Sequence, residues 1–323
     1  MKRILVALVA LMLIIPASSF AQAQKTTLKK NLTIGFIPMT MNNEYFITMV
    51  KAAGQEAAKS GSKLIVQAGD SHSDADSQLT IIENMIQRKV DAICIVPSSS
   101  SSLMVALKQA EKAGIPVINL DTKIDAKLVA DAGLKPVPFI GTNNYDGAVK
   151  GGAYALKNFG IAGKKVAILT GISGQQNAAD RRNGFVDGAK GIKIIAEQTA
   201  NWEIDQGFNV AQNILQANPD IAFISCGNDN MALGALRAVK EAGMSDKVRV
   251  MGFDAISSAL DAIEQGTLAA TVAQYPAEMG ILGVQMAQKL ASGQKGDLMT
   301  STKTEIIDKS NVAAFKQYLK QFE

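Results

Sequence analysis

The stretch RKVDAICIVPSSSSSLMVALKQAEKAGIPVINLD, residues 88–121, decides the fold. It contains an apolar run, a polar turn, a helical pattern, an Ala-Gly pair and a second apolar run that is followed at once by Asp121. A later stretch, ANPDIAFISCGNDNMALGALRAVKEAGMSDKVRVMGFD at residues 217–254, repeats this order and ends at Asp254. Strands that alternate with helices predict parallel sheets built from βαβ units. Repetition over this length predicts two similar α/β domains.

The same alternation continues on both sides of these stretches. Apolar runs typical of strands covered on both faces lie at 32–37, 63–68, 91–97, 114–121, 136–144, 164–171, 191–200, 220–228 and 247–254, with a further strand expected at 303–308. Helical spacing of apolar residues occurs within 46–57, 79–86, 102–113, 148–155, 179–191, 208–217, 230–243 and 276–290.

Composition fits a globular protein with enough apolar material for one or two domains. The chain has 323 residues, of which 47% are hydrophobic and 19% charged. The net charge of +4 is spread along the chain without a basic run. A surface that follows nucleic-acid phosphates needs such a run, so we expect no nucleic-acid partner.

The first residues have the pattern of a secretory signal peptide. Lys2 and Arg3 precede the apolar run ILVALVALMLII, and Ala21 and Ala23 flank Gln22 in an A-x-A cleavage site. A membrane anchor is the alternative, but the apolar run is about half of the ~20 residues that a spanning helix needs. We therefore expect residues 1–23 to be removed and the mature protein to be soluble outside the cytoplasm.

The remaining reactive residue types predict no catalytic or metal centre. Cys94 and Cys226 lie inside apolar runs, which favours two buried free thiols over a disulfide. His72 is the single histidine and lies in a polar loop, so we expect it to have no special role. One histidine permits no Ser-His-Asp set, and no cofactor motif is present. A glycosidase that uses Asp121 and Asp254 stays open as the enzyme alternative.

Polar and aromatic residues collect just after the expected strands. In open α/β sheets, ligands bind outside the carboxyl ends of the strands. The residues at these points are Asn42, Asn43, Tyr45, Phe46, Asp70, Ser98–Ser100, Asp121, Thr122, Thr142–Asn144, Gln175–Asn177, Arg181, Trp202, Asn228–Asn230, Phe253, Asp254, Gln274 and Tyr275. Amides, carboxylates and guanidinium groups bridge neighbouring hydroxyls, and aromatic rings pack on the C–H face of a sugar. This set predicts a small polyhydroxylated ligand.

Each of these residues also has an ordinary structural explanation. Asn43 and the strand-end aspartates can cap helices, Trp202 can belong to the core, and one of Arg181 and Arg182 is expected to face solvent. Two equivalent aspartates, Asp121 and Asp254, in two similar halves make a shared site the better interpretation.

Seven motifs in one order give the chain a specific resemblance. They are TMNNEYF (40–46), GIPVINLD (114–121), IGTNN (140–144), GISGQQNAADRRNGF (171–185), CGNDNMALGAL (226–236), VMGFD (250–254) and GTLAATVAQYP (266–276). From residue 32 to the C-terminus, the chain resembles the periplasmic sugar-binding proteins of ABC transporters, and most of all their ribose-binding branch (periplasmic binding protein type I).

The resemblance implies an α/β fold of two Rossmann-like lobes with parallel sheets, joined by a three-crossing hinge. The implied lobes are 31–141 plus 275–301 and 142–274 plus 302–323. Such a protein captures a small sugar or polyol in the cleft and delivers it to an ABC transporter permease. It is not an enzyme, and we expect a monomer without cofactor. Presentation of the ligand to a chemoreceptor or kinase is a further possibility, whereas a sugar-responsive repressor would begin with a helix-turn-helix.

The resemblance also implies ligand contacts, and it has departures. The contacts fall on Asn43, Tyr45, Phe46, Asp121, Thr142, Ile172, Arg181, Trp202, Asn228, Phe253, Asp254 and Gln274, and Thr122 joins this set beside Asp121. The ribose branch has Arg at the position of Thr122, Asn at that of Val96 and Ser at that of Met39, and it has Phe where this chain has Tyr45 and Trp202. Loss of two polar partners would leave ribose hydroxyls unpaired, at roughly 1–3 kcal/mol each. We therefore expect a ligand other than ribopyranose.

Overall fold

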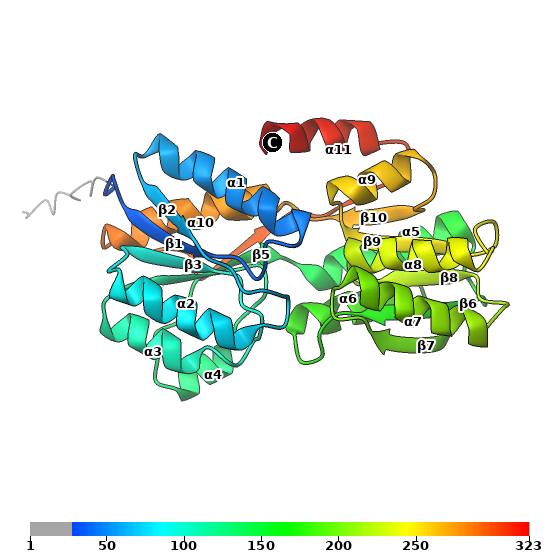
Figure 1. The fold of residues 1–323 in the computed structure, drawn as a ribbon, viewed down its shortest axis with the longest axis horizontal. Helices are drawn as coiled ribbons and strands as arrows, with labels where there is room; N and C mark the ends of the chain where they lie inside the picture. Colours follow the sequence, from blue (N-terminus) through cyan, green and yellow to red (C-terminus); the bar gives the residue numbers. More distant parts are fainter. Residues whose placement is uncertain (1–27, 323) are drawn as a thin grey trace, which may run out of the picture.

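The computed structural model describes residues 28–322 and forms two α/β lobes. The first lobe contains a six-stranded sheet of order β11-β5-β4-β3-β1-β2, and the second a six-stranded sheet of order β12-β10-β9-β8-β6-β7. Figure 1 shows the lobes side by side, with β1 to β5 in one and β6 to β10 in the other. The predicted signal peptide, residues 1–23, lies outside the described residues.

The strands of the first sheet are β1 (Thr33–Ile37), β2 (Lys63–Val66), β3 (Ala92–Ile95), β4 (Val117–Leu120), β5 (Phe139–Thr142) and β11 (Met299–Thr302). Those of the second are β6 (Lys165–Thr170), β7 (Lys193–Thr199), β8 (Phe223–Cys226), β9 (Arg249–Asp254), β10 (Ala270–Ala273) and β12 (Glu305–Ile307). The helices are α1 (Glu44–Lys59), α2 (Ala75–Gln87), α3 (Met104–Lys112), α4 (Ala126–Asp131), α5 (Asn144–Phe159), α6 (Gln176–Gly188), α7 (Ile204–Ala217), α8 (Asp229–Glu241), α9 (Ser257–Glu264), α10 (Pro276–Ala291) and α11 (Val312–Leu319).

The two sheets repeat one topology. Reading each order from its edge, β4 and β9 occupy the same place, as do β3 and β8, and β1 and β6. The predicted internal repeat and the α/β class are thereby confirmed. The strands pair in parallel, except that β12 runs antiparallel to β10 at the edge of the second sheet. Because β4 and β9 are equivalent, the aspartates that follow their last apolar residues stand at equivalent sheet edges.

Several elements had no sequence-based prediction. These are α4, α9, β10, β11 and α11. The helix α4 has only six residues, and the sequences of β10 (ATVA) and β11 (MTST) lack bulky apolar side chains. Short segments carry little periodic signal, and pairing with a neighbouring strand decides the structure of β10 and β11.

Helices cover both faces of each sheet. In the first lobe α1 packs beside α10 on one face and α2 beside α3 on the other, and in the second lobe α5 pairs with α6 and α7 with α8. Cys94 and Cys226 lie buried and free in β3 and β8, as predicted. Fully buried Phe36 and Phe223 stand on the central strands β1 and β8. Each lobe therefore has three layers, with its sheet between two layers of helices.

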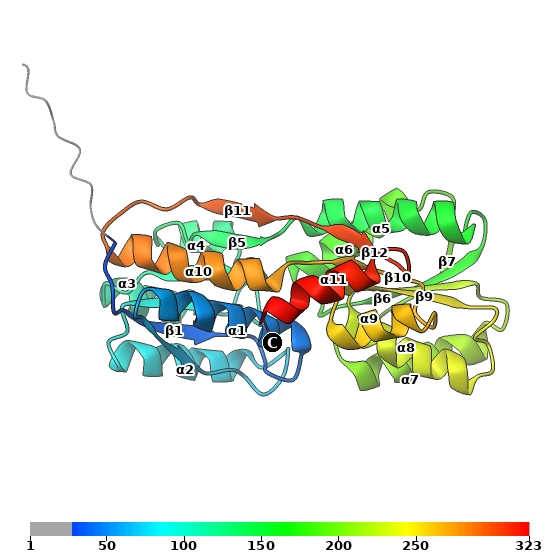
Figure 2. The same cartoon turned by 90° about the horizontal axis from the view of Figure 1, so that it is seen from above.

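The chain passes between the lobes three times. It leaves the first sheet after β5, returns between β10 and α10, and crosses again between β11 and β12 (Figure 2). Three adjacent crossings form a hinge that can bend while the two lobes stay aligned with each other. The crossings lie beside the carboxyl ends of β5 and β10, where polar residues of the two lobes meet.

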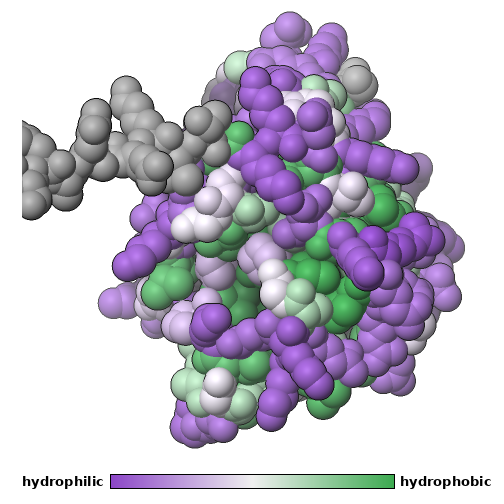
Figure 3. Space-filling model, turned by 90° about the vertical axis from the view of Figure 1, so that its left-hand side faces the viewer, coloured by the Kyte–Doolittle hydropathy of each residue, from purple (hydrophilic) through white to green (hydrophobic). Residues whose placement is uncertain are grey.

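The far end of the first lobe exposes some apolar side chains. Figure 3 looks at this end and shows hydrophobic residues between polar ones. Leu298 and Met299, before and at the start of the edge strand β11, are among the exposed large apolar residues. Within residues 28–322, no helix combines the length and apolar character needed to cross a bilayer.

The contact between α5 and α6 depends on glycine. A Cβ added at Gly184 would collide with the carbonyl oxygen of Tyr145, whereas a Cβ at Gly54 in α1 would meet no heavy atom within 4 Å. We expect Gly184→Ala to destabilise the protein by about 1–3 kcal/mol through overpacking. Gly54→Ala, the matched control, should stabilise it by about 0.5–1 kcal/mol through helix propensity. Urea unfolding followed by circular dichroism measures both, and equal effects would contradict the packing model.

Candidate functional site

A cavity lies between the two lobes at the carboxyl ends of the strands. Its volume is about 30 Å³, well below the ~300–1,000 Å³ range of ligand pockets, so the lobes lie closed with little free space between them. The first lobe lines it with Met39, Asn43, Tyr45, Phe46, His72, Asp121 and Thr122, and the second with Asn177, Arg181, Trp202, Asn228, Asp254 and Gln274. The polar residues collected at the strand ends of the two halves thus converge on one space.

On the first lobe, Asp121 is held by neutral donors. The Tyr45 hydroxyl donates to Oδ1 of Asp121 at 2.7 Å, and Thr122 Oγ1 donates to Oδ2 at 3.1 Å. Burial, together with the charge of Asp121, raises the pKa of Tyr45 well above its ordinary value, so the phenol keeps its proton. Asn43 caps α1 by accepting from the backbone N–H of Tyr45 at 3.0 Å. The Asn43 cap therefore positions Tyr45, and Tyr45 in turn positions the carboxylate of Asp121.

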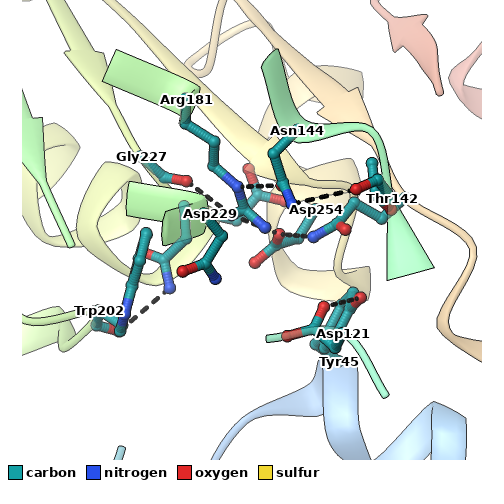
Figure 4. A network of polar contacts seen from close by, with 12 residues as sticks. Tyr45, Asp121, Thr142, Asn144, Arg181, Trp202, Gly227, Asp229 and Asp254 are labelled. Atoms are coloured by element: carbon teal, nitrogen blue, oxygen red, sulfur yellow. Dashed lines mark hydrogen bonds and ion pairs between the residues drawn. The ribbon is translucent and has the colours of Figure 1, made fainter. Parts of the chain in front are cut away.

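On the second lobe, Arg181 is the centre of a buried network. Its Nε donates to Asn144 at 2.8 Å, and its NH1 donates to the Gly227 carbonyl at 2.8 Å and to Asp254 at 3.1 Å. The guanidinium carbon lies 4.0 Å from the centre of the Phe253 ring. Figure 4 shows this network facing Asp121 and Tyr45 from the other side. Both members of the Arg181–Asp254 ion pair are buried, so each depends on the other.

The second carboxylate, Asp254, has spare accepting capacity. Besides Arg181, it accepts from Gln274 Nε2 at 2.7 Å. Burial raises the pKa of Asp254 to about 6, against the opposing effects of Arg181 and Gln274. Both interactions use Oδ1, and Gln274 Oε1 is a buried acceptor without a partner among the described residues. The free acceptors of Asp254 and Gln274 can therefore accept hydrogen bonds from a bound ligand.

Asp229 stands behind Asp254 and stabilises the loop after β9. It accepts from Thr271 Oγ1 at 2.7 Å and from the backbone N–H of Ile256 at 3.0 Å. Burial, followed by the charge of Asp254, raises the pKa of Asp229 well above its ordinary value. The sequence placed Asp229 at a strand end but gave no signal that it points away from the cavity.

Trp202 is held rigidly at the wall of the second lobe. Its ring lies against Gly171 and Gly227, where an added Cβ would collide with the indole or approach it to 3.0 Å. Its carbonyl accepts from Asn228 Nδ2 at 3.1 Å, and its indole N–H donates to Gln175 Oε1 at 2.7 Å. Asn228 also caps α8 through the N–H of Met231 at 2.9 Å. In this closed arrangement the ring is therefore fixed by packing on two glycines and by the hydrogen bond to Gln175.

The backbone at the cavity is conformationally unusual. Within the described chain, seven non-glycine residues have positive φ angles, and five of them are Asp121, Asn201, Trp202, Asp254 and Ala255. The φ of Asp121 is 58°, that of Asp254 is 124° and that of Trp202 is 68°. Such conformations cost of order 1–3 kcal/mol each and cluster at functional sites. Their concentration here supports a binding site independently of side-chain chemistry.

The position of His72 corrects the expectation of a loop residue without a role. The ring is 3% exposed, lies 2.8 Å from Glu203 of the second lobe through Nδ1, and 3.2 Å from Asn43 through Nε2. The pKa of Glu203 is lowered, first by its hydrogen bond with His72. A contact that joins residues 72 and 203 leaves no local pattern, so the sequence could not reveal it.

Three of the expected contacts do not line this cavity. Phe253 packs beneath Arg181, and Thr142 lies 3.3 Å from Thr302 where two hinge crossings meet. Ile172 is half-buried against the core. Conversely, Met39, His72 and Asn177 line the cavity although they are not among the contacts that the resemblance implies.

Metal and thiol chemistry find no support in the described part of the chain. Residues 28–322 contain no group of three His, Cys, Asp or Glu side chains placed to hold a metal ion. Burial raises the pKa of Cys94 to about 12, and it raises that of Cys226 as well. Neither thiol is therefore a ready nucleophile.

Removal of Arg181 should leave Asp254 as an unpaired buried carboxylate. We expect Arg181→Met to destabilise the protein by about 3 kcal/mol near neutral pH. The folded-state pKa of Asp254 is already above that of an unfolded aspartate, and the variant raises it further. Stability from this group is lost as pH rises through the folded-state pKa, so the variant should lose more stability at high than at low pH.

Urea unfolding at about pH 5 and about pH 8 measures this difference. The matched control is Arg182→Met, because Arg182 pairs with Glu197 on the surface and should contribute at most about 1 kcal/mol. An equal effect of the two substitutions would contradict the buried network.

Comparison with known proteins agrees with this geometry. A model of the periplasmic binding protein domain matches residues 34–295. The chain is 37% identical to the D-ribose/D-allose-binding protein of Pseudomonas aeruginosa over 265 residues, covering 81% of this chain and 82% of that protein. It is 35% identical to the D-allose-binding periplasmic protein of Escherichia coli over 277 residues, covering 85% and 86%.

A solved structure has the same fold. The periplasmic solute-binding protein of an ABC transporter from Actinobacillus succinogenes, with bound D-allose, is 36% identical and superposes with a TM-score of 0.83, covering 88% of this chain and 99% of that one. These names describe binding proteins and none describes an enzyme, so the glycosidase alternative is not favoured. The chain belongs to the periplasmic binding protein domain family.

Proposed function

We propose that the protein captures a small sugar or polyol in the cavity between its lobes and delivers it to the permease of an ABC transporter. One observation carries this proposal: a buried strand-end carboxylate from each lobe, Asp121 and Asp254, lines the same cavity together with the rings of Phe46 and Trp202. Carboxylates accept from hydroxyls, and rings pack on the C–H face of a sugar. The relatives named above bind ribose or allose, which supports this ligand class.

The ligand contacts divide between the lobes. We propose that Asn43, Tyr45, Phe46, Asp121, Thr122, Arg181, Trp202, Asn228, Asp254 and Gln274 contact the ligand. In this proposal Thr142, Ile172 and Phe253 support those residues from outside the cavity. Gln274 Oε1 and the second oxygen of Asp254 are the acceptors that would take ligand hydroxyl protons.

Delivery follows from closure. A ligand that contacts both lobes stabilises the closed form by its differential affinity, and the closed form presents a different surface to a partner. We propose 31–141 plus 275–301 and 142–274 plus 302–323 as the moving bodies, with a monomer acting in the periplasm after removal of residues 1–23. Presentation of the closed form to a chemoreceptor would use the same site.

The first-lobe wall favours a ligand other than ribopyranose. Thr122 and Met39 line the cavity where the ribose-binding branch has Arg and Ser, and Val96, where that branch has Asn, is buried outside the lining. Thr122 already donates to Asp121, so it does not replace a guanidinium. A ligand with fewer hydroxyls on this side, or with a C–H group against Met39, fits the wall better than ribose.

A thermal-shift screen of pentoses, hexoses, ketoses, deoxy sugars and polyols tests the ligand class. We expect at least one of these compounds to raise the melting temperature by several degrees, because a ligand at 100 times its Kd adds about 2.7 kcal/mol of stability. We expect ribose to give less than the largest shift. A largest shift with ribose would contradict the specificity argument, and no shift with any compound would contradict the proposed function.

The pH dependence of binding tests the role of Asp254. Ligand hydroxyls bind the ionised carboxylate, whose pKa is about 6, so affinity should fall as the pH is lowered through this value. We expect about a tenfold loss between about pH 7.5 and about pH 5 by titration calorimetry with the best sugar. Asp254→Asn should bind more weakly and without this pH dependence. A variant that keeps the pH dependence of the unmodified protein would assign it to another group.

A further inference from the structure

The side chain of Gln175 joins the two lobes beside the cavity. Its Nε2 donates to the carbonyl of Ser98 in the first lobe at 2.7 Å, and its Oε1 accepts from the indole N–H of Trp202 at 2.7 Å. The residue is 3% exposed, and it precedes α6 without capping it. Gln175 does not line the cavity, so these contacts serve something other than direct ligand binding.

The two partners determine the orientation of the amide. An indole N–H only donates and a backbone carbonyl only accepts, so the oxygen of Gln175 must face Trp202 and its NH₂ group must face Ser98. Glutamate could accept from Trp202 but could not donate to Ser98, and leucine could do neither. The site therefore requires an amide.

The first-lobe partner is itself immobilised. The backbone N–H and the hydroxyl of Ser98 both donate to Gln78 Oε1, at 2.8 and 3.0 Å, and Gln78 Nε2 donates to the Val96 carbonyl at 2.8 Å. Gln78 is completely buried. The loop after β3 thus presents the Ser98 carbonyl in a fixed direction.

We propose that Gln175 is a positioning residue that couples the orientation of Trp202 to closure of the lobes. The bond to Ser98 crosses the cleft, so separation of the lobes breaks it and releases the amide to rotate. The hydrogen bond from Trp202 to Gln175 lies within the second lobe. It keeps its geometry only while the bond to Ser98 fixes the amide of Gln175. Closure therefore completes the wall of the cavity that Trp202 forms. This inference rests on the proposed function, because it concerns closure around a ligand.

The single tryptophan permits a direct test in the closed, sugar-bound form. The chain contains one Trp, so a ¹H–¹⁵N spectrum shows one indole N–H signal, and it belongs to Trp202. With a saturating sugar bound, we expect Gln175→Ala to shift this signal upfield and to speed its exchange with solvent, because the indole loses its acceptor. Gln175→Glu should keep the hydrogen-bonded shift. The matched control is Gln176→Ala, because the exposed Gln176 bonds only to Asp180 within α6. An unchanged indole signal in Gln175→Ala would overturn the proposal.

Binding kinetics test the coupling. With the sugar that gives the largest thermal shift, we expect both Gln175 variants to dissociate about tenfold faster than the unmodified chain, the equivalent of one hydrogen bond present only in the closed form. Association should change little, and Gln176→Ala should behave as the unmodified protein.

The outcomes separate this proposal from the function on which it rests. If Gln175→Ala alters the indole signal but Gln175→Glu dissociates at the unmodified rate, Gln175 orients Trp202 without coupling to closure, and the proposal is overturned. If no sugar binds the unmodified chain, the proposed function fails and the coupling fails with it.

Discussion

The structure of the site depends on one constraint: a carboxylate buried in the second lobe must be compensated by its surroundings. Asp254 meets it through Arg181 and Gln274, and Arg181 in turn requires Asn144 and the Gly227 carbonyl. Removal of a charge from water costs several kcal/mol unless such partners are in place. The positive φ of Asp254 turns its carboxylate towards these partners, and the neighbouring cap of α8 brings the Gly227 carbonyl into reach. The helix cap, the strand end and the unusual backbone therefore all help to position the Arg181–Asp254 ion pair.

In the first lobe, the buried carboxylate is compensated by a different kind of donor. Asp121 stands at the same place in its sheet, but its donors are the hydroxyls of Tyr45 and Thr122 rather than a guanidinium. Neutral donors neutralise less charge than an arginine does, and they occupy both oxygens of the carboxylate. The cavity is consequently asymmetric: its cation lies on the second lobe, beside the acceptors that remain available. An asymmetric wall discriminates between ligands because each polar group left unpaired on closure costs about 1–3 kcal/mol.

The sequence predicted the parts of the site that recur along the chain. The repeat located β4 and β9, and with them Asp121 and Asp254, and strand ends located the amides around them. It could not locate contacts between distant loops, such as His72 with Glu203 or Gln175 with Ser98, because no local pattern records them. Residue type also does not reveal direction. Asp229 and Phe253 follow the same rule as their neighbours but point behind the cavity, where they support Asp254 and Arg181. The short elements β11 and α4 escaped prediction because neither is long enough for a periodic signal: pairing with β5 forms β11, and the cap Asp125 begins α4.

The polar character of the cavity also explains why closure would depend on a ligand. When the lobes meet, Gln274 Oε1 is buried without a partner among the described residues, and only one oxygen of Asp254 is engaged. A buried acceptor left unsatisfied costs of order 1–3 kcal/mol, and a hydroxyl that donates to it recovers this cost. The contacts that cross the cleft, from Gln175 to Ser98 and from His72 to Glu203, favour closure whether or not a ligand is bound. The balance between these two sets gives a ligand with correctly placed hydroxyls its differential affinity for the closed form. A cavity lined only by apolar residues would close with or without a ligand. Its closed form would then not tell a transporter whether a ligand is bound.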